Sequence, residues 1–190
     1  MEPLGLVSHP QHPPAAIRGV QAHLLGIDAG RLRLRWRVDG AHALVLPPAA
    51  GTARADGLWQ TTCFEVFLRR DGRPDDAGAY VEWNLSPSGR WNAYDFVAYR
   101  EGMAPRPLPR APETSMRSDG DDPDRALIFD AALPLAGAPP LPCRLGISAV
   151  IEEHGGIKSY WALAHPAAGG PDFHAAACWS ARLEPSAATP

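Results

Sequence analysis

Residues 56–103, DGLWQTTCFEVFLRRDGRPDDAGAYVEWNLSPSGRWNAYDFVAYREGM, decide the fold and hold most of the unusual residue combinations in the chain. Within this stretch, residues 62–68 and 79–85 alternate apolar and polar side chains with the two-residue repeat of a β-strand. The intervening DGRPDD at 71–76 has the glycine and proline content of a turn. The two segments are therefore predicted to pair as an antiparallel hairpin.

One face of this predicted hairpin carries an unusual set of polar side chains. In 62–68, Phe64, Val66 and Leu68 fall on the side opposite Glu65. Pairing of the strands places four side chains on a shared face: Glu65, Tyr80, Glu82 and Asn84. A carboxylate on a strand whose other face is core is costly to bury without a partner. We therefore expect this face to form the ligand-binding site, where repulsion between two carboxylates would raise the pKa of one of them.

Three tryptophans near this face are candidates for ligand contact. An indole ring offers a flat apolar surface with a polar edge, which suits the C–H face of a sugar ring. Core packing explains the same residues equally well, as it does for Trp36 and Trp83, which we assign to the core. The candidate contacts outside the hairpin are Trp59, Trp91, Trp161 and His165.

The rest of the chain also alternates like strands. Residues 31–38 place Leu32 and Trp36 on one side and four arginines on the other, which predicts a half-buried strand with a solvated basic face. Residues 143–153 and 157–165 form a second predicted hairpin around His-Gly-Gly. A last strand is expected at 178–183, a short strand at 43–46, and an edge strand at 4–9.

About ten short segments with turn signals and no helical period predict an all-β fold, an antiparallel β-sandwich of immunoglobulin-like or jelly-roll-like type. The length of 190 residues with 45% hydrophobic content suits one domain over 1–190. The ends at 1–15 and 184–190 are expected to fray, and 101–124 to form a long loop rich in proline and aspartate with a short strand at 114–117. The acidic run at 118–124 lacks the flanks of a calcium loop and is predicted to be a solvated turn.

Composition excludes several classes of function. A formal net charge of -3 predicts no nucleic-acid partner. Three cysteines are too few for a disulfide framework, and no secretory signal or run of 18 apolar residues is visible. We therefore expect a cytoplasmic protein that does not enter membranes. No metal site is predicted, because the nine-residue spacing of His165 and His174 fits no metal motif, even with Glu152 as a third donor.

Three stretches carry a family resemblance: LWQTTCFEVFL, YVEWNLSPSGRWNAYDFVAYREGM and ISAVIEEHGGIKSYWALAHPAAGGPDFH. From about Trp36 to the last predicted strand, the chain resembles bacterial DOMON-like proteins related to family 9 carbohydrate-binding modules. The resemblance implies a β-sandwich whose members bind sugars or haem, often without catalysis. By this resemblance the tryptophans would stack on a saccharide, while Glu65, Glu82 and Asn84 would bind its hydroxyl groups.

These observations, together with the resemblance, predict a non-catalytic domain that binds a small ligand of carbohydrate class. One alternative is an enzyme that uses Glu65 and Glu82 as paired carboxylates on a sugar-like substrate; a separation of about 5 Å would fit a retaining hydrolase. A second alternative is haem binding, for which the resemblance offers the candidate axial ligands Met103, Met116, His165 and His174. The sequence does not identify any other cofactor.

Overall fold

The computed structural model describes residues 2–72, 78–119 and 126–185. Its regular structure there is almost entirely β, and no helix in these ranges is long and apolar enough to cross a membrane. The strands are β1 (Leu4–Ser8), β2 (Gly19–Asp28), β3 (Arg31–Asp39), β4 (Cys63–Arg70), β5 (Tyr80–Leu85), β6 (Trp91–Phe96), β7 (Ala104–Pro105), β8 (Glu113–Asp119), β9 (Ala126–Pro134), β10 (Cys143–Glu153), β11 (Ile157–Ala162) and β12 (Ala181–Leu183). Short 3-10 turns occur at η1 (Ala41–Ala43), η2 (Leu58–Gln60) and η3 (Ala176–Cys178).

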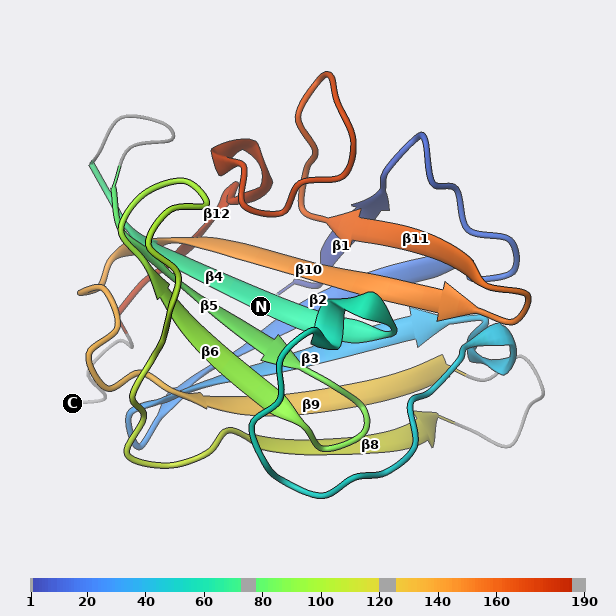
Figure 1. Ribbon diagram of the computed structural model, residues 1–190, viewed down its shortest axis with the longest axis horizontal. Helices are drawn as coiled ribbons and strands as arrows, with labels where there is room; N and C mark the ends of the chain where they lie inside the picture. Colours follow the sequence, from blue (N-terminus) through green and yellow to red (C-terminus); the bar gives the residue numbers. More distant parts are fainter. Residues whose placement is uncertain (1, 73–77, 120–125, 186–190) are drawn as a thin grey trace.

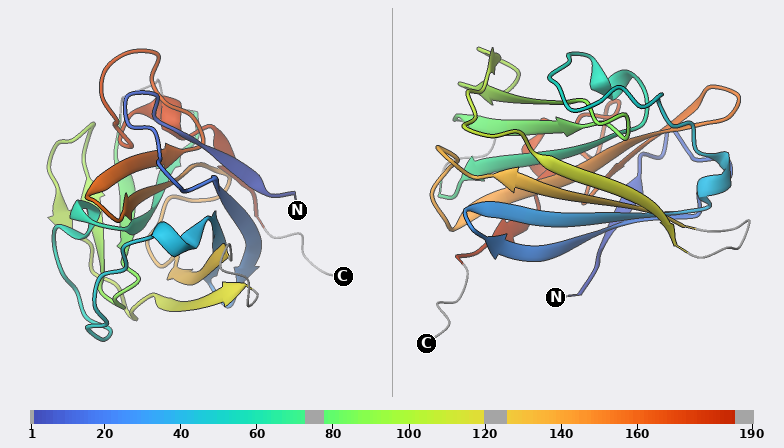
Figure 2. Two further views of the ribbon diagram at one scale, coloured as in Figure 1. Left: turned by 90° about the vertical axis from the view of Figure 1, so that its right-hand side faces the viewer. Right: turned by 90° about the horizontal axis from the view of Figure 1, so that it is seen from below.

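The antiparallel strands form one continuous hydrogen-bonded path that curls into two facing layers, as in a β-sandwich (Figures 1 and 2). The order along the path is β7-β6-β5-β4-β10-β11-β1-β2-β3-β9-β8, and β12 pairs with β10 beside it. We call β4 to β7, β10 and β11 the site sheet, and β2, β3, β8 and β9 the opposite sheet. This architecture confirms the all-β sandwich predicted from the alternation.

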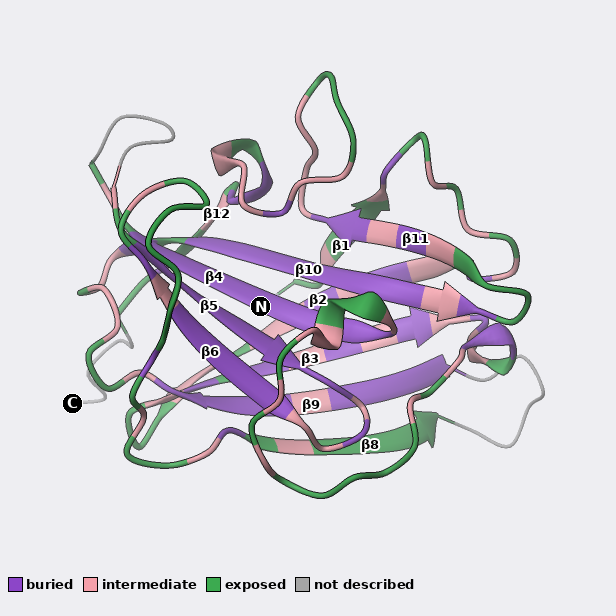
Figure 3. Ribbon diagram, in the orientation of Figure 1, coloured by how far each residue is buried: buried purple, intermediate pink, exposed green. Residues whose placement is uncertain are grey.

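The main core lies between the two sheets and follows from strand alternation. In β3, Leu32, Leu34 and Trp36 are 0% exposed, as predicted. The ring of Phe64, from β4, stacks on Phe129 of β9 with centroids 4.5 Å apart. Burial of large aromatic side chains from both sheets is the main source of stability in such a fold, and Figure 3 shows the buried strands on either side of this core.

The arginine face of β3 is not simply solvated, because its side chains form ion pairs. Arg35 Nε lies 2.6 Å from Asp130 Oδ1 on the neighbouring β9, and Arg33 pairs with Asp28 on β2 at 3.0 Å. Alternation predicted which face the arginines occupy. Asp28 is a near neighbour of Arg33 in the β2–β3 hairpin, whereas Asp130 comes from β9, which only the tertiary fold brings alongside β3.

β1 differs from the predicted edge strand. Its Leu4, Gly5 and Leu6 pair with β2, and its Val7 and Ser8 pair with β11, so the strand passes from one sheet to the other. The start of the chain, expected to fray over 1–15, is thus built into both sheets.

Further segments differ from the sequence expectations. At 43–46 the backbone forms the end of η1 and a single bridge from Leu44 to Glu153 in place of a strand. At 178–183 only Ala181–Leu183 is strand, and Cys178 is the last residue of η3. Most of the turn expected at 71–76 and of the acidic run at 118–124 lies outside the described residues.

Candidate functional site

A second apolar cluster lies on the outer face of the site sheet, under residues 163–180, which we call the C-terminal segment. It loops out above β10 and returns to β12 (Figure 1). Trp179 from this segment stacks on Phe67 of β4 with centroids 5.8 Å apart. The indole fits because Gly146 beneath it has no side chain: a Cβ there would lie 2.2 Å from Trp179 Cδ1. The segment is thereby held against the sheet.

Beside this cluster, the outer face of the site sheet forms a cavity of about 420 Å³. This volume falls within the range of small-molecule sites. The site sheet supplies the floor and part of the walls, and loops supply the rest of the walls. The lining residues are Trp59, Glu65, Glu82, Tyr94, Phe96, Arg100, Met103, Val150, Tyr160, Pro171, Phe173 and His174.

Two buried glutamates lie on the floor of the cavity. Glu65 is 3% exposed and Glu82 is 5% exposed. In the β4–β5 register Glu65 faces Asn84 and Phe67 faces Glu82, so the two carboxylates are diagonal neighbours on one face. Asn84 Nδ2 donates a hydrogen bond to Glu82 Oε1 at 2.7 Å. The pairing and shared face agree with the prediction from the sequence.

The cavity perturbs the acidity of both glutamates. Burial raises the pKa of Glu65 well above its usual range, and the nearby charge of Glu82 raises it further. Burial also raises the pKa of Glu82, to about 7, against the opposing effects of the Asn84 hydrogen bond and Arg100. Ser148 lies opposite Glu65 on β10 and lowers its pKa somewhat, although its hydroxyl forms no hydrogen bond of good geometry with any described residue. The pair therefore holds a proton at neutral pH.

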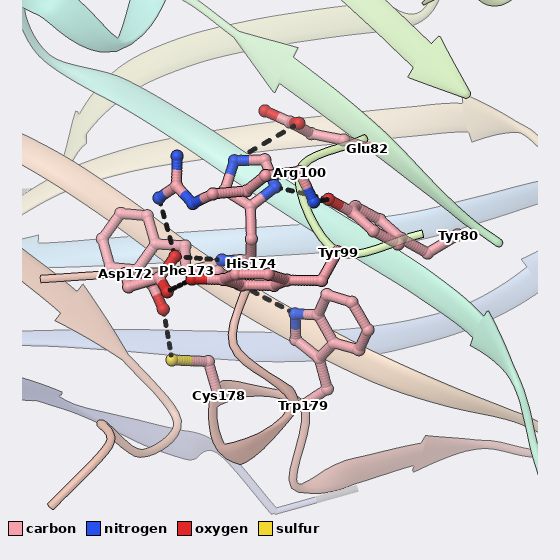
Figure 4. A network of polar contacts seen from close by, with 9 residues as sticks. All are labelled: Tyr80, Glu82, Tyr99, Arg100, Asp172, Phe173, His174, Cys178 and Trp179. Carbon is pink, nitrogen blue, oxygen red and sulfur yellow. Dashed lines mark hydrogen bonds and ion pairs between the residues drawn. The ribbon is translucent and has the colours of Figure 1, made fainter. Parts of the chain in front are cut away.

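His174 joins the C-terminal segment to the carboxylate face (Figure 4). Its Nδ1 lies 2.7 Å from the Tyr80 hydroxyl, and its Nε2 lies 3.9 Å from Glu82 Oε2. The ring also packs edge-on against Phe67 and Phe96. Burial, reinforced by the charge of Arg100, lowers the pKa of His174 to about 4, so the imidazole is neutral at pH 7.

Asp172 connects the C-terminal segment to the loop that follows β6 (Figure 4). Its Oδ1 accepts hydrogen bonds from Arg100 Nη2 at 2.7 Å and from the His174 backbone N–H at 3.1 Å. The Tyr99 hydroxyl donates to Oδ2 at 2.5 Å. Burial raises the pKa of Asp172, but the bonds from Tyr99 and Arg100 outweigh it and the net pKa is lowered. Asp172 is thus ionised and balances the charge of Arg100.

The opposite wall depends on a separate polar network around Tyr94. The Tyr94 hydroxyl donates to Asp56 Oδ1 at 2.6 Å, and Asn92 Nδ2 donates to the same oxygen at 2.8 Å. Arg54 Nη1 donates in turn to Asn92 Oδ1 at 2.7 Å. These bonds secure the loop before β4, which carries Trp59 at the cavity lining with 41% of its surface exposed.

The structure separates the predicted site residues into two groups. Glu65, Glu82 and Trp59 line the cavity. Tyr80 and Asn84 form hydrogen bonds to two lining residues, His174 and Glu82 respectively. The other three predicted contacts do not line the cavity, and each has another role: Trp91, Trp161 and His165.

These three residues point elsewhere because of alternation and local bonding. Trp91 packs in the core between the sheets, with the Arg54 guanidinium 4.3 Å from its ring centre. Trp161 is also in that core, where its Nε1 donates to Ser159 Oγ at 2.9 Å. The alternation that places Tyr160 at the cavity turns Trp161 away from it. His165 Nε2 contacts the Val7 carbonyl at 3.0 Å.

Sequence reasoning missed several lining residues. Tyr94 and Phe96 carried a usable signal, because a strand with aromatics on both sides must place one set outside the core. The sequence suggests His174 only as a metal or haem ligand, and Arg100 and Phe173 carried no signal. They lie in loops without periodicity, and the tertiary fold alone brings them over the sheet.

Neither a metal centre nor a reactive thiol is part of this site as described. Within the described ranges, no group of three or more His, Cys, Asp or Glu residues is arranged to hold a metal ion. Cys63, near Asn84, is buried, and burial together with Glu65 raises its pKa well above the usual value. A protonated, enclosed thiol is a poor nucleophile.

The fold and cavity define an all-β, sandwich-like protein with a buried carboxylate pair under an aromatic-walled pocket. Comparisons of the chain with protein-family models, with curated proteins and with solved structures found no match.

Proposed function

We propose that this protein binds a small polar ligand, of carbohydrate class, in the cavity on the outer face of the site sheet, without chemically transforming it. The observation that carries the proposal is the combination of a floor of buried hydrogen-bonding groups with walls of aromatic rings in one cavity of about 420 Å³. Sugars present both hydroxyl groups and apolar C–H faces, so they need both kinds of surface.

In this proposal the floor and the walls of the cavity contact different parts of the ligand. Glu65, Glu82 and the neutral His174 offer acceptors and donors for hydroxyl groups. Trp59 and Tyr160 offer ring faces at the mouth of the cavity, where the indole remains partly exposed. The kinship with DOMON-like proteins is likewise a proposal, supported by the quoted motifs and by the all-β fold. A cytoplasmic location is proposed because all three cysteines are unpaired thiols.

The test is a thermal-shift screen against neutral, acidic and amino sugars, with calorimetry on each hit. Binding to the native state must raise the Tm as ligand concentration rises. Trp59→Ala should weaken the affinity for a hit by about tenfold. Met116→Ala, at an exposed apolar residue on β8 in the opposite sheet, should leave it unchanged. A panel without any Tm increase, or a hit indifferent to Trp59→Ala, would contradict the proposal.

A second candidate is acid–base catalysis on a sugar-like substrate. The pKa of Glu82, raised to about 7 by burial, is favourable for proton transfer at neutral pH. Glu65 faces Asn84 and not Glu82, so the carboxylates are diagonal and not directly opposed. Turnover of the tightest ligand, abolished by Glu82→Gln while binding survives, would establish catalysis in place of binding alone.

The cavity does not fit haem well. Of the candidate axial ligands only Met103 and His174 line it, because Met116 lies on β8 and His165 contacts the Val7 carbonyl. A porphyrin would lay its apolar face over Glu65 and Glu82 and leave both without polar partners, which is costly for buried carboxyl groups. We therefore derive no role for haem.

A further inference from the structure

We infer that the ligand of the cavity carries a positive charge, and that it is an amino sugar whose ammonium group lies between Glu65 and Glu82. The inference rests on the proposed function and specifies its ligand class. It is carried by the geometry of charges in the cavity, by the rings around them, and by the absence of a cationic partner for the two glutamates among the described residues.

The two glutamates are the uncompensated acidic groups of this site. In the described ranges the one ion-pair contact to either is from His174 Nε2, 3.9 Å from Glu82 Oε2, and this imidazole is neutral at pH 7. Asn84 satisfies one oxygen of Glu82. Elsewhere in the fold, the half-buried Asp130 has two arginine partners, Arg35 and Arg117, each at 2.6 Å.

Among the described residues, Arg100 is the one arginine that lines the cavity, and its charge is already balanced. Its guanidinium lies 2.7 Å from Asp172 Oδ1, and that carboxylate also accepts a bond from Tyr99. Arg100 lowers the pKa of both glutamates only in part. An anionic ligand would have to displace Asp172 from Arg100 while it approached Glu65 and Glu82, so the charges disfavour an anion.

A cation would relieve the cost of burying the two carboxylates. Removal of an acidic group from water is expensive unless an opposite charge with good hydrogen-bond geometry accompanies it. An ammonium group has three donors. It can therefore bond to both carboxylates, each of which lines the cavity.

The walls add a second feature that favours a cation. Five aromatic rings line the cavity: Trp59, Tyr94, Phe96, Tyr160 and Phe173. The face of an aromatic ring attracts ammonium groups, and enclosure by several rings is a common means of amine recognition. The same rings serve the C–H faces of a sugar, so an amino sugar uses the floor and the walls together.

The experiment compares matched pairs of sugars by calorimetry at pH 6: glucosamine with glucose, galactosamine with galactose, and mannosamine with mannose, plus the neutral N-acetyl form of each. One amino sugar should bind at least about tenfold more tightly than its neutral counterparts. Binding should also release protons, because an ammonium group favours ionisation of the carboxyl pair. Proton release is obtained from the dependence of the measured heat on the ionisation enthalpy of the buffer.

Variants separate the effect of charge from that of fold. Glu82→Gln keeps the shape of the side chain and should remove most of the preference for the amino sugar. Glu113→Gln, which removes a carboxylate from an ion pair at the surface of β8, should leave the preference intact. If Glu82→Gln does not fold, Glu65→Gln and the proton release of the unmodified protein still decide whether the ligand is a cation.

The outcomes distinguish this inference from the function on which it rests. A preference for amino sugars with proton release supports both. Neutral sugars that bind as tightly as the amino sugars, or binding without proton release, overturn the cationic ligand but leave sugar binding in place. No binding by any sugar of the matched pairs or of the wider screen overturns both.

Discussion

Three buried glutamates have different hydrogen-bonding environments in this fold. Glu153 is 1% exposed, and its carboxylate accepts backbone N–H hydrogen bonds from Ala15, Ala16 and Ile17 at 2.9, 2.6 and 3.1 Å. That is the environment of a structural carboxylate, with its charge satisfied by the protein itself. Glu65 and Glu82 are as buried but lack such a set of donors, which is consistent with the proposal that they bind a ligand.

Glu82→Gln is expected to change how stability depends on pH. A carboxyl group whose pKa is higher in the folded state binds more protons there, so its contribution is complete below about pH 4.5 and is lost as pH rises through about 7. A pKa that differs by one between the folded and unfolded states corresponds to roughly 1.4 kcal/mol. Relative to the wild type, the variant should therefore gain stability between pH 5 and pH 8, as measured by urea unfolding at each pH.

The control for this prediction is Glu153→Gln. It replaces an acceptor of three backbone bonds by a neutral amide, and should lower the free energy of unfolding by about 2 kcal/mol or more. A Glu82→Gln variant that loses stability in the same manner, most strongly at pH 8, would show that the Glu82 charge is structural.

At the scale of elements, the cavity depends on how the C-terminal segment is fastened to the site sheet. Asp172 bonds to the loop after β6, and Trp179 packs on Gly146 while its Nε1 donates to the Phe173 carbonyl at 2.9 Å. Phe173 and His174 lie between these two attachments, and both line the cavity. Both attachments are made by residues of the C-terminal segment that lie outside the strands and 3-10 turns.

Gly146→Ala is expected to loosen this segment while the sandwich stays folded. The new methyl group would overlap the Trp179 indole, and overpacking of this kind costs about 1–3 kcal/mol. Amide hydrogen exchange should accelerate over 171–180, and ligand affinity should fall. Gly5→Ala is the matched control, because a Cβ on Gly5 meets no atom within 4 Å. Unchanged amide hydrogen exchange over 171–180 in Gly146→Ala would show that the packing of Trp179 on Gly146 does not hold the segment in place.

At the scale of the whole molecule, the two sheets form one path because β1 pairs with both. The strand pairs with β2 through its first half and with β11 through its second. The Glu153 carboxylate, at the end of β10, adds a second connection by holding the backbone at 15–17. The chain segment before β2 is therefore a structural link between the layers.

Deletion of residues 2–8 is expected to expose the edges of β2 and β11 at once. Unpaired strand edges associate with other chains, so the truncated protein should self-associate and melt at a lower temperature. Light scattering combined with size-exclusion chromatography measures the first effect, and thermal unfolding the second. A truncated protein that stayed monomeric with an unchanged Tm would show that β1 does not join the sheets in solution.

Alternation made the fold and the carboxylate face predictable. A strand shows its buried face through its own residues, as in β3 and β4, so the β4–β5 pairing and the shared face of Glu65, Glu82 and Asn84 could be read from the sequence. Alternation also identifies Tyr160 and Trp161 as facing opposite ways. It cannot say which of the two faces lines the cavity, and Trp161, the predicted contact, lies in the core instead.

The sequence by itself determined the all-β architecture and the set of polar residues on one hairpin face, because both follow from local two-residue periodicity. Only the tertiary structure decided that this face would be covered and become a cavity. Arg100 and Asp172 are 72 positions apart, and Tyr80 and His174 are 94 apart. No local pattern links such residues, and the burial that raises the pKa of the glutamates exists only once the distant segments have packed over them.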